Sequence, residues 1–118
     1  MDRATATVSE LVRRAVEICD PGEVDPDLGR FQRQLEDDDE PVTAVQNLEE
    51  RLAIAIEGAD NAGENPAVSV ASAVVLYLAS HGGRVDADRN PGELIRLAVK
   101  AQWHGHPPAA VSDWIAGR

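Results

Sequence analysis

The sequence predicts an all-α protein: a bundle of five or six short helices around one central apolar helix at about residues 66–81. Three observations support this prediction. Apolar residues recur at steps of three and four along most of the chain, as on the buried face of a helix. Asp25-Pro26, Asn65-Pro66 and Asn90-Pro91 each place a capping side chain before a proline suited to a first helical turn. No segment forms a convincing strand, and 118 residues with 43% hydrophobic side chains fit a single helical domain, residues 1–118.

The first helix is predicted to begin after Thr7. Thr7 and Glu10 have the spacing of a capping box, in which a hydroxyl and a carboxylate each accept a hydrogen bond from a free amide at the helix start. Asp20-Pro21-Gly22 ends this helix. Its apolar stripe consists of Val8, Leu11, Val12, Ala15, Ile18 and Cys19.

A second, shorter helix is predicted from Pro26 to about Glu36, with Asp25 as its N-cap. Gly29 weakens it by up to roughly 1 kcal/mol relative to alanine. Its stripe is narrow and contains Leu28, Phe31 and Leu35.

Four adjacent carboxylates follow, Asp37, Asp38, Asp39 and Glu40, and Pro41 comes directly after them. Like charges repel one another, and the residue before a proline disfavours the helical conformation. We therefore expect a solvated connection. The same run is a candidate surface for a basic partner, or for a hard cation held nonspecifically.

The third helix has the clearest amphipathic pattern in the chain. Thr43 is its predicted cap, and Gly58, Asn61 and Gly63 supply the break at its end. The positions that follow the helical period are Val45, Leu48, Leu52, Ala55, Ile56 and Ala59.

The central helix lies within the longest uncharged run, Asn65 to Gly83. Its apolar middle, Ala67 to Ala79, is shorter than the roughly 20 residues of a membrane span, so we expect a buried helix and no membrane contact. The β-branched valines leave a buried strand as the alternative, but the alanines and flanking caps favour a helix. The residues that surround its axis are Val68, Val70, Ala71, Val74, Val75, Leu76 and Leu78.

Two further helices are predicted after His81-Gly82-Gly83, which is typical of a helix C-terminus. One begins at Asn90-Pro91, ends at His104-Gly105 and packs through Leu94, Ile95, Leu97, Ala98, Ala101 and Trp103. The other opens at Pro107-Pro108, carries Val111, Trp114 and Ile115 and stops at Gly117.

Charge is distributed unevenly along the chain. The formal net charge is −10, from 21 acidic and 11 basic residues. Residues 1–64 form an acidic half with 17 acidic and 6 basic side chains, whereas residues 65–118 are nearly neutral. A domain this acidic repels phosphate, so we expect no nucleic-acid partner. The acidic half suits a basic protein partner, and two alternatives stay open: an ordinary solvated face, or adaptation to high internal salt.

Targeting and redox features are few. Cys19 is the only cysteine, so an intramolecular disulfide is excluded, and the first residues lack a signal-peptide pattern. These observations lead us to expect a cytoplasmic protein.

Two imidazoles, His104 and His106, lie close together at a predicted helix end and are the strongest candidates in the chain for metal-binding side chains. Together with His81 or a carboxylate such as Asp113 they are candidate ligands for a transition metal. The alternative is a helix stop followed by a proline turn, with Trp103 and Trp114 sealing the core. The segment from Asp86 begins like an EF-hand loop, but proline replaces the required glycine and leucine the required glutamate.

Catalytic patterns find no positive support. Cys19 sits on an apolar stripe, no Gly-x-Ser-x-Gly elbow surrounds a serine, and Lys100 follows no glycine-rich loop. The final helix pair loosely resembles a helix-turn-helix in architecture only, because residues 109–116 carry no basic side chain.

The sequence therefore favours a non-enzymatic protein-interaction or adaptor module with an acidic surface and no resident cofactor. Its candidate partner-binding residues are Asp37, Asp38, Asp39, Glu40, Trp103 and Trp114. Self-association into a homo-oligomer stays open. The alternative function is a metal- or small-ligand-binding helical protein that uses the C-terminal histidines.

Overall fold

The computed structural model describes residues 7–20, 22, 24–36, 47–59, 65–80 and 91–117. This part contains six helices and no strand, so the predicted all-α bundle is confirmed and the alternative of a buried strand at 67–79 is wrong. The helices are α1 (Val8–Cys19), α2 (Pro26–Leu35), α3 (Leu48–Ala59), α4 (Pro66–Ser80), α5 (Pro91–Trp103) and α6 (Ala109–Ala116).

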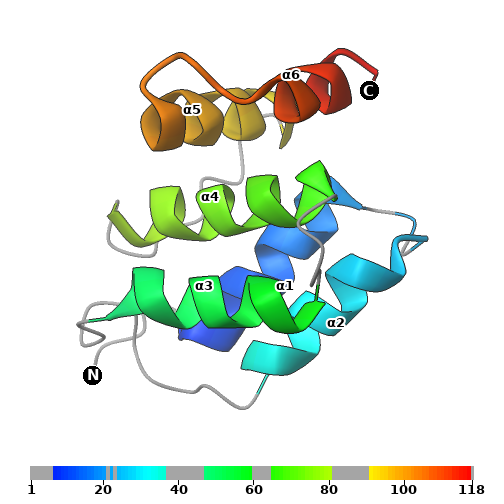
Figure 1. The fold of residues 1–118 in the computed structure, drawn as a ribbon. Helices are drawn as coiled ribbons and strands as arrows, with labels where there is room; N and C mark the ends of the chain where they lie inside the picture. Colours follow the sequence, from blue (N-terminus) through cyan, green and yellow to red (C-terminus); the bar gives the residue numbers. More distant parts are fainter. Residues whose placement is uncertain are drawn as a thin grey trace.

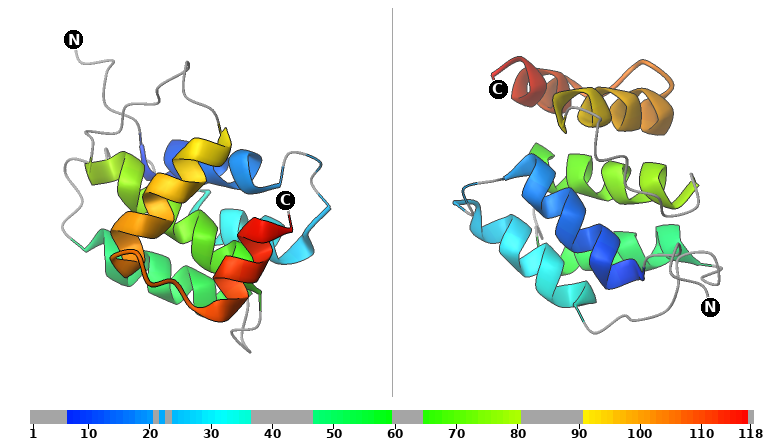
Figure 2. Two further views of the ribbon diagram at one scale, coloured as in Figure 1. Left: turned by 90° about the horizontal axis from the view of Figure 1, so that it is seen from above. Right: turned by 180° about the vertical axis from the view of Figure 1, so that it is seen from behind.

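Helix α4 lies at the centre and contacts each of the other five helices (Figure 1). Helices α5 and α6 lie above α4 in this view, and α3 and α2 lie below it. The view from behind shows α1 crossing the far side of α4 (Figure 2). Although α5 and α6 both pack on α4, none of their Cα atoms approach one another within 8 Å.

The central position of α4 follows from its composition. An uncharged helix that is apolar on all sides gains most when neighbours cover it all round. Nine of its residues are buried, and Val68, Val70, Val74 and Val75 are completely inaccessible to solvent. Each such valine contributes about 1.5 kcal/mol or more through burial, so α4 supplies much of the stabilisation of the bundle.

The start of α1 is the predicted capping box. The Thr7 hydroxyl accepts a hydrogen bond from the Glu10 amide at 3.2 Å, and the Glu10 carboxylate accepts one from the Thr7 amide at 3.3 Å. The predicted stripes of the first two helices are buried in full, from Val8 to Cys19 in α1 and from Leu28 to Leu35 in α2.

Helix α5 ends at His104-Gly105, as predicted, and the structure shows that this end is a left-handed cap. Both residues have positive φ, 51° at His104 and 85° at Gly105, and the Gly105 amide donates to the Lys100 carbonyl at 3.2 Å. This hydrogen bond and the left-handed residue before it form a Schellman motif, with a histidine where glycine is usual.

The buried face of α5 differs from the predicted one. Val99 is buried, whereas Ala101 is exposed and Leu97 is only half-buried. The face that meets α4 and α1 follows Leu94, Ile95, Ala98 and Val99, so the last turn of α5 passes beyond the edge of the core. The prediction that Ala101 packs inside was therefore wrong.

Several predicted features lie outside the described residues: the Thr43 cap and Val45, the His81-Gly82-Gly83 stop, the Asn90 cap and the first five residues of the EF-hand-like segment. Among the helices described, none combines the length and the apolar character that crossing a membrane requires.

Candidate functional site

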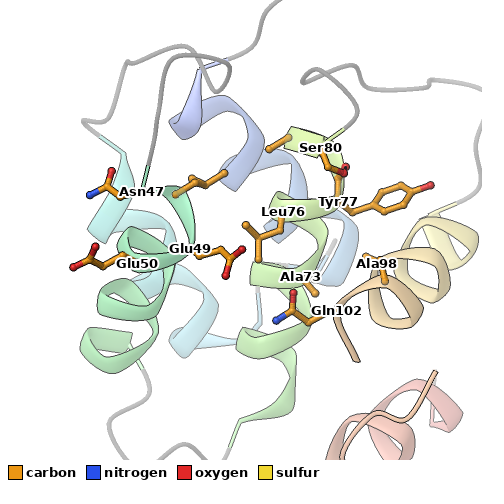
Figure 3. A pocket seen from close by; sticks show the side chains of 12 residues that line it. Asn47, Glu49, Glu50, Ala73, Leu76, Tyr77, Ser80, Ala98 and Gln102 are labelled. Atoms are coloured by element: carbon orange, nitrogen blue, oxygen red, sulfur yellow. The ribbon is translucent and has the colours of Figure 1, made fainter. Parts of the chain in front are cut away.

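An open groove of about 670 Å³ lies in the described surface beside the last turns of α4. Helix α4 forms its floor, the start of α3 forms one wall and the last turns of α5 form the other (Figure 3). A volume of this size is within the range of binding sites. We refer below to this feature as the α3–α4–α5 groove; its described lining is Asn47, Leu48, Glu49, Glu50, Ala73, Leu76, Tyr77, Ala79, Ser80, Ala98, Ala101 and Gln102.

The groove exists because neighbours cover α4 unequally. Helix α1 covers the far side of α4, and α3 and α5 approach from opposite sides, which leaves one face of the last α4 turns open (Figures 1 and 2). Leu76 and Tyr77 lie there and are half-buried, whereas the two residues directly before them, Val74 and Val75, are buried. The groove floor is therefore an extension of the core that reaches solvent.

The polar side chains of the groove differ between its two walls. Figure 3 shows the Glu49 carboxylate directed toward Leu76, the Glu50 carboxylate directed away from the floor, and the Gln102 amide reaching from α5 toward α4. Asn47 lies on the same wall as the two glutamates, and its side-chain oxygen accepts a hydrogen bond from Arg51 Nε at 3.2 Å. The two glutamates are the charged side chains among the described lining residues, so this lining is anionic.

The ionisable side chains of the described lining are Glu49, Glu50 and Tyr77. This lining contains no imidazole, thiol or amine that would act as a base or nucleophile. The Ser80 hydroxyl is engaged, because it donates to the Tyr77 carbonyl at 2.8 Å. What the groove offers is apolar contact flanked by negative charge.

The two predicted tryptophans lie on different helices. Trp103 is the last residue of α5 and Trp114 lies in α6, and both are half-buried against the core. Both helices pack on α4, and no Cα atom of α5 lies within 8 Å of a Cα atom of α6. Neither tryptophan lines the groove.

The acidic run Asp37–Glu40 lies outside the described residues. Including these four, eight of the 17 carboxylates of residues 1–64 lie outside the described residues. Of the six basic side chains of residues 1–64, only Arg3 lies outside the described residues. Within the described part, arginines partly offset the carboxylates of α1 and α2, as in the exposed Arg30–Asp27 ion pair. The charge asymmetry of the chain therefore comes mainly from residues outside the described part.

Both histidines of the C-terminal turn are exposed. His104 holds the left-handed position after α5, and the amide of His106 donates to the Trp103 carbonyl at 2.8 Å. The described residues contain no group of three or more His, Cys, Asp or Glu side chains placed to hold a metal ion. His81, the third predicted ligand, lies outside the described residues.

A polar junction joins the ends of four helices. The buried Asp20 carboxylate accepts the amides of Val24 and Asp25 at 3.2 and 2.8 Å, and Arg30 Nε donates to the Ala59 carbonyl at 3.3 Å. Asn65 donates from its amide to Asp25 and Asp27. Every one of these contacts fixes a turn or a helix end, so we assign the junction a structural role.

Sequence reasoning missed the groove residues. Leu76 was predicted to be one of the apolar residues around the axis of the central helix, and Glu49 and Glu50 were not singled out as site residues. The available signal was the position of Tyr77, an amphipathic residue near the end of an otherwise apolar helix, because such residues favour surfaces that are partly buried and partly wet.

No model of a known protein family matches the chain, and comparisons with curated proteins and with solved structures give no significant match. Function is therefore inferred from the described residues themselves.

Proposed function

We propose that this protein is a non-enzymatic interaction module that binds a protein segment in the α3–α4–α5 groove. The observation that carries the proposal is the half-buried pair Leu76 and Tyr77 on the floor of an open groove with polar walls. Apolar residues at the centre with polar residues around them are the usual composition of a protein–protein contact.

The shape of the groove favours a protein segment over a small molecule. Small-molecule sites enclose most of the surface of their ligand, whereas this groove is open along three helices. Its polar groups are spread along the walls and do not converge on one point (Figure 3). An extended surface with a few apolar contacts is the arrangement that accommodates a segment of another chain.

Peptide selection followed by mapping tests the proposal. Random peptides long enough for several helical turns are selected on the immobilised protein, and the binders are mapped by chemical-shift changes in its backbone amide spectrum. We expect the changes to centre on Leu76, Tyr77 and Gln102. Peptides that map elsewhere on the surface would overturn the proposal.

An occluding substitution provides the matched control. Ala101 is exposed on the groove wall, so Ala101→Trp fills the groove without disturbing the core, and Ala110→Trp adds the same side chain to an exposed position of α6. Ala101→Trp should weaken peptide binding by about tenfold or more, the loss of one well-packed contact, and Ala110→Trp should leave it unchanged. Equal affinities for both variants would contradict a groove site.

A further inference from the structure

We propose that the occupant of the α3–α4–α5 groove is a cationic amphipathic helix of another protein, with an apolar side chain on Leu76 and Tyr77 and basic side chains toward Glu49 and Glu50. This inference rests on the proposed function and specifies the chemistry of the partner. It is argued from the charge of the lining, from the secondary structure of the walls and from the net charge of the chain.

The charge of the groove selects a basic partner. Glu49 and Glu50 are its charged lining residues among those described, and both are exposed at the start of α3. The nearest basic side chain on that helix, Arg51, donates to Asn47 and lines a separate hollow with Ile54 and Leu35 on another side of α3. Arg51 itself is not among the described lining residues, so Glu49 and Glu50 are the charges of the described lining that a lysine or arginine of a partner would meet.

The walls select a helix over other peptide conformations. A peptide that adds as a strand needs a sheet edge, and the described part of the chain is entirely helical with connecting turns. A polyproline segment needs a surface lined by several aromatic rings, and Tyr77 is the aromatic residue of this lining. An amphipathic helix needs an apolar floor between two walls, which α4, α3 and α5 supply (Figure 3).

The net charge disfavours a second copy of this chain as the occupant. Each copy carries −10, so two copies repel one another as they approach, whereas a basic segment is attracted. A heterologous cationic partner is therefore the inference, and self-association is one outcome of the test.

Two synthetic helical peptides test the inference. Both carry leucines at i, i+4 and i+7; one has lysines at the flanking positions and the other has glutamates in their place. Fluorescence anisotropy gives their dissociation constants, and amide chemical shifts give their position. We expect the lysine peptide to bind at Leu76 and Tyr77, to lose affinity in Ala101→Trp and to weaken as salt is raised.

Charge variants separate a specific contact from general attraction to an acidic protein. Replacing both Glu49 and Glu50 by glutamine should weaken the lysine peptide about fivefold, the effect of two solvent-exposed ion pairs. Glu57→Gln is the matched control, because Glu57 is exposed on the same helix outside the groove. A loss of equal size in Glu57→Gln, or full binding to Ala101→Trp, would show nonspecific attraction and overturn the inference.

The remaining outcomes distinguish this inference from the proposed function. Equal binding of the glutamate peptide in the groove would overturn the cationic partner while the groove stays a binding site. If neither designed peptide binds but selected peptides map to Leu76 and Tyr77, the cationic partner is likewise overturned and the groove stays a binding site. Sedimentation velocity that shows a dimer lost in Ala101→Trp would assign the groove to a second copy and likewise overturn the inference. If no selected peptide maps to the groove, the proposed function fails as well.

Discussion

Asn65 and Asp25, 40 residues apart in the sequence, meet at the junction of α2 and α4. The amide nitrogen of Asn65 lies 3.1 Å from both carboxylate oxygens of Asp25, while its side-chain oxygen accepts the Ala67 amide at 3.0 Å. Asp25 in turn caps α2 by accepting the Asp27 amide at 3.0 Å. Two N-caps are thus bonded to each other, and the pair fixes the start of α2 against the start of α4.

Replacing Asn65 by alanine removes both the cap and the donor to Asp25. We expect Asn65→Ala to lower the free energy of unfolding by about 1–2 kcal/mol, as measured by urea unfolding followed by circular dichroism. Asn65→Asp keeps the cap acceptor but places a third carboxylate beside Asp25 and Asp27. Asn65→Asp should therefore also lower the free energy of unfolding at neutral pH. An Asn65→Asp variant as stable as the parent at neutral pH would show that the amide donor contributes nothing.

Asp20 is expected to stabilise the turn between α1 and α2. Its buried carboxylate accepts hydrogen bonds from two backbone amides, and Asp20→Ala leaves both donors without that acceptor. The substitution should therefore lower the free energy of unfolding by about 1–3 kcal/mol. The comparison variant is Glu17→Ala, which removes an exposed carboxylate of α1 and should change stability by no more than about 0.5 kcal/mol. Thermal unfolding measured by calorimetry compares the two. Similar losses in both would indicate a general effect of charge in place of the two hydrogen bonds.

Gly29 lies within α2, where a methyl group has room. A Cβ atom built at this position meets only Arg33 Nη2, at 3.9 Å. We expect Gly29→Ala to stabilise the protein by about 0.5–1 kcal/mol, because alanine loses less backbone entropy in a helix. Gly58→Ala in α3 should raise the free energy of unfolding by less, because its Cβ would lie 2.9 Å from the Gln34 side chain and that side chain must move. A chemical denaturation series checks the order of the two gains, and a destabilised Gly29→Ala variant would contradict the placement of this residue.

His104 occupies a left-handed backbone position at the end of α5. For a residue with a Cβ atom this conformation costs about 1 kcal/mol, which glycine avoids. His104→Gly should therefore raise the melting temperature. Gly105→Ala should lower it, because φ is 85° there as well, even though its Cβ would meet no other atom within 4 Å. Differential scanning calorimetry that shows a higher melting temperature for His104→Gly and a lower one for Gly105→Ala supports the left-handed cap. A lower melting temperature for His104→Gly would contradict it.

Zinc titration tests the alternative function proposed from the C-terminal histidines. His104 and His106 provide two of the four ligands of a structural zinc site, and no described cluster provides the others. We expect calorimetry of the full chain to show no saturable uptake at micromolar zinc. Saturable uptake lost in the double variant His104→Gly, His106→Ala would establish the metal site and contradict this expectation.

Local rules account for the parts of the fold that the sequence predicted. The Thr7–Glu10 box, the Asp25-Pro26 and Asn65-Pro66 starts and the stop at His104-Gly105 each involve residues a few positions apart. Their geometry depends on the chain nearby, so each was readable before the tertiary structure was known. The uncharged composition of residues 66–80 likewise placed α4 at the centre, because only a covered helix tolerates apolar residues on every side.

Which part of each apolar surface stays open depends on how the helices pack against one another. Leu76 and Val75 are adjacent and equally apolar, yet one is half-buried on the groove floor and the other is buried. Ala101 is exposed and Val99 is buried because of how α5 lies on α4. These differences depend on the packing of helices distant in sequence, as does the bond between Asn65 and Asp25, and no local pattern specifies that packing. Local sequence patterns are enough to predict the helices and to identify the central one, whereas the position of the candidate binding groove depends on how the helices assemble.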